Sequence, residues 1–269
     1  GLTPAGDVYV AAVVGEEIGG LGSRYLAGSF HPDLAIIGEP SSNTLRRGHR
    51  GRCEFIVTLR GRSAHASVPA QAINPHYDLA RLLLALREID MHYEPVTGGS
   101  TVAPTLLRSD QRSANVIPGE LMLHLDWRNA PGESPEEAMA RLQALLDDTL
   151  GEETTFSLDV RTDHAISYTG YEQDVRQAVA PFWMETDDPL LLAARDQLQQ
   201  ALTREVAVDV WQFYTDGGFL YGAGVPCIGF GPGDPRMAHV FDERLSVDEL
   251  IEAVAGYMAL ALQMGAVGG

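Results

Sequence analysis

The 269-residue chain contains only two cysteines, Cys53 and Cys227. Two thiols in unrelated sequence contexts exclude a disulfide framework and a zinc site built from several thiolates, and they favour a reducing compartment. No apolar run is long enough to cross a bilayer, and the first residues lack the basic and apolar segments of a signal peptide. From these absences we expect a cytoplasmic location and no membrane partner.

Basic residues are also scarce. Lys and Arg number 19 against 37 Asp and Glu, which gives a formal net charge of -18. A charge of this sign repels nucleic acids and anionic lipid, so we expect neither as a partner. A hydrophobic content of 45% with 21% charged residues is typical of a globular protein with a substantial core.

Buried strands and helices alternate at both ends of the chain. Residues 7–14, DVYVAAVV, and 34–40, LAIIGEP, read as buried strands of a parallel sheet, with a short helix within 18–29 between them. The same character returns after residue 164, with a helix over 188–202, a strand over 225–233 and a helix over 247–264. This pattern predicts an α/β domain with a mostly parallel sheet, made of residues 1–47 and 164–269.

Residues 48–163 have a different pattern. Alternating strands are expected over 52–60, 101–110, 120–128 and 155–162, and amphipathic helices over 75–89 and 134–150. The second helix begins with a capping box, in which Ser134 is the N-cap and Glu137 follows three residues later. The order β-α-β-β-α-β predicts an inserted ferredoxin-like α+β domain.

Three predicted buried strands end in segments that could ligate a metal. Glu16 and Glu17 follow the first strand, Glu39 follows the second, and His239 lies in the loop after the third. Taken alone, a Glu at a strand end is usually a solvated loop residue or a helix cap. A single His in a loop usually has no role as a ligand. Together, carboxylate and imidazole groups at the carboxyl ends of strands suit a divalent metal such as zinc.

Four motifs, in order along the chain, resemble the M20 family of metallopeptidases. They are GEE at 15–17 with GEP at 38–40, GRSAHASVPAQAINP at 61–75, NVIPGE with DWRNAPGE within 115–133, and the segment from TDGG to AHVFDE within 215–243. This family includes acetylornithine deacetylase, succinyl-diaminopimelate desuccinylase, carboxypeptidases and aminoacylases. The resemblance implies a zinc-hydrolase catalytic domain with an inserted dimerisation domain.

The resemblance also implies roles for individual residues. Glu16 matches the general base that activates the attacking water, Glu17 and His239 match ligands of one zinc, and Glu39 matches a ligand of the other. Two zinc ions per subunit are expected, with cobalt or manganese as alternatives. His65 matches the histidine that reaches the active site of the partner subunit in a homodimer and stabilises the oxyanion.

Further positions match groups that contact the substrate in this family. They are Asn115, Arg128, Thr215, Asp216, Gly217 and Gly218. Arg128 would grip a carboxylate of a small-molecule or dipeptide substrate, although an ordinary charge on a sheet face is nearly as good an interpretation. For residues 215–218, plain turn chemistry is a better interpretation than binding.

The segment before Glu16 departs from the family pattern. M20 sequences place an H-x-D motif and a bridging aspartate ahead of the Glu-Glu pair. Only 15 residues precede Glu16 here, and Asp7 is the sole acidic residue among them. We therefore expect the N-terminal part of the catalytic domain to be missing, and a complete two-metal site not to form from this chain alone.

The leading hypothesis is a metal-dependent hydrolase that cleaves an amide bond, as an N-acyl amino acid deacylase or a small-peptide peptidase. One alternative is a catalytically inactive fragment or scaffold that dimerises through the inserted domain. Another is a ferredoxin-like module that binds an amino acid without turnover.

A second H-x-D pattern, His124-Leu-Asp126, lies within the predicted strand over 120–128. Because alternate side chains of a strand share a face, His124 and Asp126 should point the same way. We interpret the pattern as an accident of that strand and not as a metal site.

Overall fold

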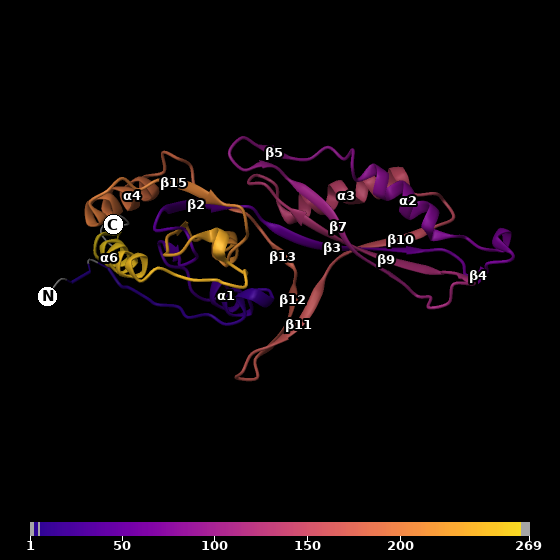
Figure 1. Cartoon of the computed structure of the whole chain (residues 1–269), viewed down its shortest axis with the longest axis horizontal. Coiled ribbons are helices and arrows are strands. Elements are labelled where there is room, and N and C mark those ends of the chain that lie inside the picture. Colours follow the sequence, from indigo (N-terminus) through magenta and orange to yellow (C-terminus); the bar gives the residue numbers. More distant parts are fainter. Residues whose placement is uncertain (1–2, 5, 265–269) are drawn as a thin grey trace. The chain divides into compact units, whose positions relative to one another are not determined.

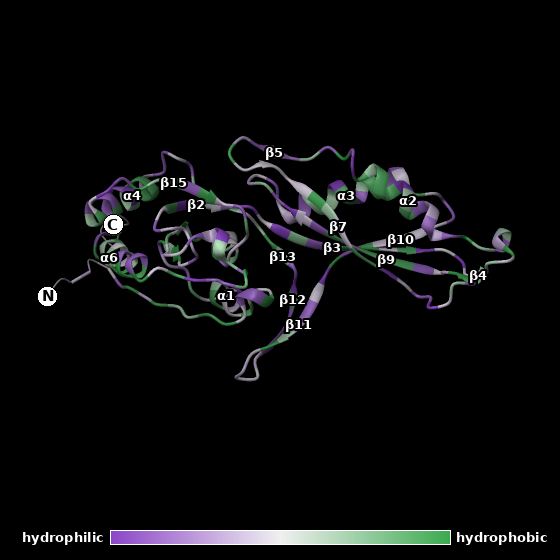
Figure 2. Cartoon of the chain, in the orientation of Figure 1, coloured by the Kyte–Doolittle hydropathy of each residue, from purple (hydrophilic) through white to green (hydrophobic). Residues whose placement is uncertain are grey.

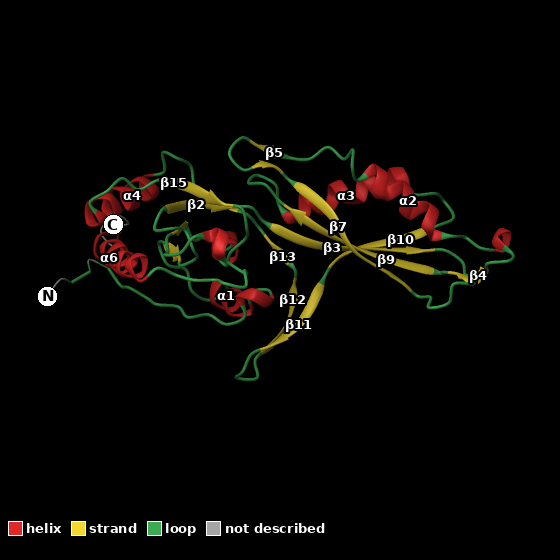
Figure 3. Cartoon of the chain, viewed as in Figure 1, coloured by secondary structure: helices red, strands yellow, loops and turns green. Residues whose placement is uncertain are grey.

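The computed structural model describes residues 3–4 and 6–264. The chain divides into two compact units (Figure 1). The first contains the residues up to 50, residues 166–171 and the residues from 181 onward; the second contains residues 51–165 and 172–180. Helices and strands occur in both units (Figure 3), and each unit is described by itself.

The second unit is built on an antiparallel sheet in the order β10-β3-β9-β7. Its strands are β3 (Arg52–Arg60), β7 (Thr101–Ser109), β9 (Glu120–Arg128) and β10 (Thr155–Val160). Helices α2 (Pro75–Ala85) and α3 (Pro135–Thr149) lie side by side along it (Figure 1). The chain order β3-α2-β7-β9-α3-β10 confirms the ferredoxin-like prediction.

The alternation of side chains along β3 and β9 gives this sheet two different faces. Phe55 and Val57 on β3, and Leu125 and Trp127 on β9, join the core beneath the helices with residues such as Leu142. Apolar stretches of β9 and α2 are green in Figure 2. The residues between them in sequence point to the opposite face, which is charged. A strand of this kind folds one side into a core and leaves the other open.

The predicted start of α3 is confirmed in detail. The Ser134 hydroxyl accepts a bond of 3.1 Å from the Glu137 N–H, and the Ser134 N–H donates to Glu137 Oε2 over 2.8 Å. Pro135 occupies the first turn. Helix α2 ends at Ala85, four residues before the predicted Ile89, because the chain passes into a tight turn in which Glu88 N–H bonds to the Ala85 carbonyl.

The first unit has a mixed sheet. Its strands are β1 (Ala35–Ile37), β2 (Leu45–His49), β14 (Phe182–Trp183), β15 (Val208–Trp211) and β16 (Cys227–Gly229). The β1–β16 and β2–β15 pairs are parallel, whereas β2 runs antiparallel to β14 and β16. The described strands therefore contain fewer parallel pairs than the predicted, mostly parallel sheet.

Both faces of this sheet are covered. Ile36 and Ile228 pack into a cluster with α4 (Pro189–Leu202) and α6 (Val247–Gln263). Ile37 and Cys227, their sequence neighbours, pack into a second cluster with residues of α1 (Leu21–Ala27) and α5 (Gly217–Gly222). Coverage on both faces explains why β1 and β16 are continuous apolar runs.

The strand predicted over 7–14 is wrong. These residues belong to no strand, and Val10 exposes 94% of its surface, with Val8 and Tyr9 also exposed. An apolar run becomes a buried strand only when neighbouring strands pair with it, and no described strand pairs with this one. The two glutamates that follow therefore do not leave the end of a buried strand.

His49, at the end of β2, is fully buried in the first unit. Its ring lies 4.6 Å from the ring of Phe182, measured between centroids, and its Nδ1 is 2.9 Å from the carbonyl oxygen of Arg50. Burial lowers the pKa of His49 to about 4. The folded protein therefore holds this imidazole in its neutral form.

We expect the free energy of unfolding to fall as the pH drops from about 6.5 toward 4. In this window the unfolded chain binds a proton at His49 that the folded chain does not bind, so acid favours unfolding. The loss should amount to about 3 kcal/mol at this residue. Urea unfolding at several pH values measures it: His49→Gln should flatten the pH dependence, and His31→Gln, at an exposed position, should not. Equal slopes for the His49 variant and the parent would contradict the assignment.

Candidate active site

Glu16 and Glu17 lie on a single turn of 3-10 helix, Glu16–Ile18, ahead of α1. Glycines with left-handed backbones flank the turn, with φ of 73° at Gly15 and 71° at Gly20. A Cβ on Gly20 would lie 2.9 Å from Asp216 Oδ1, too close for any other residue. The glycines thus allow the Glu-Glu turn to approach the Asp216 loop.

Four carboxylates gather at this point. Burial, together with the charges of Glu39, Asp216 and Glu17, raises the pKa of Glu16 to about 7. Burial also raises the pKa of Glu39, with added repulsion from Asp216 and Glu17 and a smaller opposing effect of His239. Carboxylates that oppose one another's ionisation in this way form a site that favours a cation or a shared proton.

Asp216 is the most buried of these carboxylates, at 8% exposure. The Ser23 hydroxyl donates to its Oδ2, while Oδ1 has no hydrogen-bond partner among the described residues. Burial raises the pKa of Asp216, although the Ser23 bond and the charge of Arg24 act in the opposite direction. Ser23 is a site residue that sequence reasoning missed. Its partner is 193 positions away, and no local motif marks it.

Glu17 and His239 come together from opposite ends of the chain. His239 Nε2 lies 3.4 Å from Glu17 Oε1, and both side chains are exposed. His239 has a φ of 62°, a left-handed backbone that residues other than glycine rarely adopt. Its N–H donates to Glu243 Oε2 over 3.1 Å, so Glu243 fixes the loop that presents His239.

The donor types match zinc, but the described residues do not complete a site. Within residues 3–4 and 6–264, no three His, Cys, Asp or Glu side chains converge closely enough to hold a metal. A zinc ion takes carboxylate oxygen and imidazole nitrogen, usually from at least three protein groups. Glu17 and His239 could supply two of the donors for one ion. Glu39 lies close enough to His239 for their charges to interact.

Thr215 and Gly217 take part in the turn into α5. The Thr215 hydroxyl, which is buried, accepts a bond of 3.1 Å from the Gly217 N–H. A Cβ on Gly217 would lie 2.8 Å from the ring of Phe182, and Gly218 continues the helix. These contacts are those of a helix start, whereas Asp216 points its carboxylate toward the glutamates.

His65 and Asn115, predicted to act together, meet on a small sheet in the second unit. Strand β4 (Ala64–His65) pairs with β8 (Val116–Ile117), and the Asn115 carbonyl accepts from Ala66 N–H over 2.9 Å. His65 is exposed, and its Nδ1 lies 2.7 Å from the Ser67 hydroxyl. The second ring nitrogen of His65 thus remains available in an exposed loop.

Arg128 is bound by its neighbour Asp126. Its Nε donates to Asp126 Oδ1 over 2.6 Å, and a terminal nitrogen donates to Oδ2 over 3.3 Å. This two-bond pairing uses the fork that would otherwise hold a substrate carboxylate. The geometry therefore favours a charge on a sheet face over a free substrate anchor.

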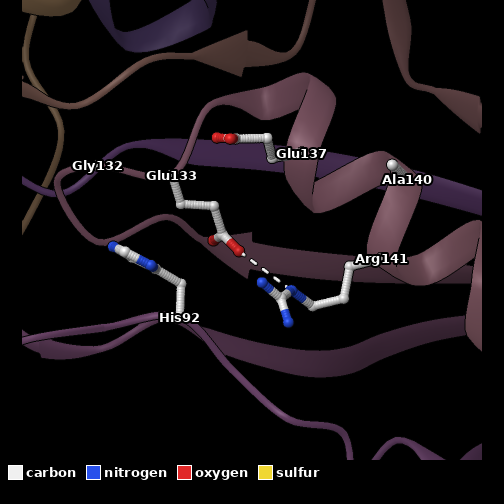
Figure 4. A pocket seen from close by; sticks show the side chains of 6 residues that line it. All are labelled: His92, Gly132, Glu133, Glu137, Ala140 and Arg141. Atoms are coloured by element: carbon white, nitrogen blue, oxygen red, sulfur yellow. Dashed lines mark ion pairs between the residues drawn. The ribbon is translucent and has the colours of Figure 1, made fainter.

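A pocket of about 380 Å³ lies elsewhere in the second unit, near the start of α3 (Figure 4). Glu133 and Arg141 point toward each other within it, 3.4 Å apart between Oε1 and Nε. Glu133 also accepts from Trp127 Nε1 over 2.9 Å, and His92 Nε2 is 2.9 Å from the Pro131 carbonyl oxygen. Because these polar groups pair within the fold, we assign the pocket a structural role.

Known proteins resemble the chain along most of its length. It is 26% identical to the protein YgeY of Escherichia coli (strain K12) over 266 residues, which cover 95% of this chain and 65% of YgeY. It is 25% identical to an acetylornithine deacetylase of Myxococcus xanthus, over 92% of this chain and 62% of the relative. The chain thus spans slightly less than two thirds of the length of these relatives.

Solved structures share the fold. The aminopeptidase PepT from Bacillus cereus matches with a TM-score of 0.72 at 15% identity, over 94% of this chain and 63% of PepT. An M20 family metallo-carboxypeptidase from Sulfolobus solfataricus matches with a TM-score of 0.64 at 14% identity, over 93% and 69% of the two chains. Residues 47–154 match the family described as a peptidase dimerisation domain. Residues 47–154 thus resemble the dimerisation domain of peptidases, within a chain that shares the fold of M20 peptidase structures.

Proposed function

We propose that the protein is a metal-dependent hydrolase that cleaves an amide bond in an N-acyl amino acid or a small peptide. The observation that carries this proposal is the meeting of Glu17 with His239, near the half-buried Glu39 and the buried Asp216. Groups from four separate segments converge on one end of the first unit. A structural role does not require such a concentration of like charges.

In this proposal Glu16 is the general base. Its carboxylate takes a proton from the attacking water and passes it to the leaving nitrogen. Glu17 and His239 would hold one zinc ion and Glu39 the other; bound zinc polarises the scissile carbonyl and makes water more acidic. His65 of the partner subunit would donate a hydrogen bond to the developing oxyanion.

The names of the relatives support the substrate class. One relative is named acetylornithine deacetylase, another is named for removal of a formyl group, and a structural neighbour is an aminopeptidase. All three names describe cleavage of a C–N bond at an acyl group. We infer a small substrate that carries a carboxylate; Arg128 would meet it only by exchanging its pairing with Asp126.

The assembly proposed is a homodimer formed through residues 47–154, which match a dimerisation domain. The net charge of -18 supports the absence of nucleic acid partners. No helix in the described part of the chain is long and apolar enough to cross a membrane. A cytoplasmic location agrees with the two reduced cysteines.

A second candidate is a catalytically inactive scaffold that dimerises through the same domain. The finding that favours it is the lack of any three converging metal donors among residues 3–4 and 6–264. The two candidates differ first in metal content, which can be measured without knowing the substrate.

We expect the protein, purified with zinc present, to retain zinc that elemental mass spectrometry detects. Glu17→Gln and His239→Ala should each lower the zinc content, because each removes a donor of the same ion. Glu185→Gln, at an exposed position away from the site, is the matched control and should change nothing. Absence of zinc from the parent protein would favour the scaffold.

A further inference from the structure

A second pocket, of about 600 Å³, lies on the open face of the sheet in the second unit. Strands β3, β9 and β7, labelled in Figure 1, contribute most of its lining, and residues 161–163, at the start of β11 (Thr162–Ile166), contribute the rest. All the residues that line it belong to the second unit. It is the face opposite the helices, where the His124-x-Asp126 pattern points.

A balanced network of charges forms one part of this pocket. Arg161 donates to both oxygens of Glu54, over 3.0 and 3.2 Å, and Arg52 lies 3.3 Å from Glu54 and 2.8 Å from Asp126. Burial favours protonation of Glu54, but the bonds from His124 and Arg161 outweigh it and lower the pKa of Glu54. Asp163, which pairs with Arg161, completes the acidic set. With Arg128, which pairs with Asp126, three guanidiniums offset the three carboxylates of the network.

His124 belongs to this network through only one of its nitrogens. Its Nδ1 lies 2.9 Å from Glu54 Oε1, and an ionised Glu54 makes Nδ1 the donor. The side chain is 9% exposed, and Nε2 has no hydrogen-bond partner among the described residues. A buried polar atom that lacks a hydrogen-bond partner lowers the stability of the fold. A bound ligand that pairs with the atom removes this cost.

Arg108 supplies the one charge in the pocket that nothing balances. It reaches the pocket from β7, and within the described part of the chain it makes no hydrogen bond or ion pair. Apolar side chains also line the pocket: Ile56, Leu106 and Met122. The pocket thus combines a surplus cation, an unsatisfied imidazole nitrogen and an apolar floor.

We propose that this pocket, whose lining residues all belong to the second unit, binds a small organic carboxylate. Arg108 would grip the carboxylate with its two-nitrogen fork, and His124 Nε2–H would donate a further bond when the ring carries both protons. The apolar part of the ligand would rest on Ile56, Leu106 and Met122. Glu54 orients the imidazole from behind, as a positioning residue.

The donor set of this pocket excludes a metal as the occupant. His124, Asp126 and Glu54 lie near one another, but no three His, Cys, Asp or Glu side chains among residues 3–4 and 6–264 are arranged to hold a metal ion. Arg52 and Arg161 pair with Glu54. Asp126 is also engaged by Arg52 and Arg128. The H-x-D pattern is thus no metal site, as the sequence indicated, and in this proposal its imidazole serves the carboxylate instead.

The test uses 4-methylpentanoate as the probe and isothermal titration calorimetry as the measurement, with the uncharged 4-methylpentanamide for comparison. We expect the carboxylate to bind at millimolar concentration and the amide to bind at least about tenfold more weakly. Arg108→Gln, at an exposed position that should not disturb folding, and His124→Gln should each weaken binding by about tenfold. Arg87→Gln, an exposed arginine outside the pocket, should leave it unchanged.

Two further measurements locate the probe. The imidazole ¹⁵N signal of His124 Nε2 should shift on titration, and Glu17→Gln should bind the probe like the parent protein, because the proposed hydrolytic site is not involved. Absence of binding, equal binding of acid and amide, or unchanged binding in Arg108→Gln would each overturn the proposal. Loss of binding in Glu17→Gln would place the probe at the hydrolytic site and would overturn it too. None of these outcomes depends on whether the protein hydrolyses amides.

Discussion

Glu16→Gln is expected to lower kcat for amide hydrolysis by about 10²–10⁴-fold while the zinc content stays unchanged. Glutamine keeps the shape of the side chain but cannot accept a proton from water. Glu17, and not Glu16, lies 3.4 Å from His239, so the metal donors remain in place. The change should therefore separate proton transfer from metal binding, two roles that adjacent residues divide between them.

The assay would follow release of the free amine from N-acetyl-L-ornithine and from a panel of N-acyl amino acids and dipeptides. Glu153→Gln, an exposed glutamate in the second unit, is the matched control and should retain full activity. If Glu16→Gln turned over substrate at the parental rate, the base assignment would fail. If it lost zinc as well, Glu16 would be a metal donor.

His65→Ala is expected to lower kcat by about 10²–10³-fold, because the oxyanion loses a preorganised donor. The protein should remain folded, since His65 is exposed and its side chain hydrogen-bonds to Ser67, two residues away. His76→Ala, an exposed histidine at the start of α2, is the matched control. Full activity of His65→Ala would remove this residue from the mechanism.

Mixing the two inactive variants tests whether the site is shared between subunits. If His65 acts on the partner's site, a mixed dimer of Glu16→Gln and His65→Ala contains one site in which both residues are intact. Random exchange should then restore about a quarter of the parental activity, because half of the dimers are mixed and each has one working site. If Glu16 and His65 of the same chain act together, mixing restores nothing.

Much of the second unit could be predicted because its signals are local. The alternation in β3 and β9 and the capping box of Ser134 and Glu137 each depend on residues a few positions apart. The same method missed β2, whose sequence LRRGH reads as polar. Its arginines are buried because of distant partners: Arg46 pairs with Asp209 at 2.8 Å, and Arg47 stacks 3.7 Å over the ring of Trp183.

The same difference between local and long-range signals decides which residues of the candidate site could be predicted. Motifs in family order pointed to Glu17 and His239, which the structure brings together. Nothing in the sequence pointed to Ser23 as the partner of Asp216, or to Arg108 beside His124, because these relations exist only after the chain folds. Burial and unpaired atoms are properties of the folded molecule, and local spacing does not encode them.

The exposed apolar segment over residues 8–10, ahead of Glu16, favours association of the protein with itself at high concentration. Val8, Tyr9 and Val10 present apolar side chains to water from a segment outside any described sheet. β-branched segments of this kind are templates on which separate molecules pair into intermolecular sheets. At Val10, 94% exposed, a charged residue would cost little folding free energy and would act as a gatekeeper against such stacking. Colloidal behaviour and folding stability can therefore be adjusted independently at this position.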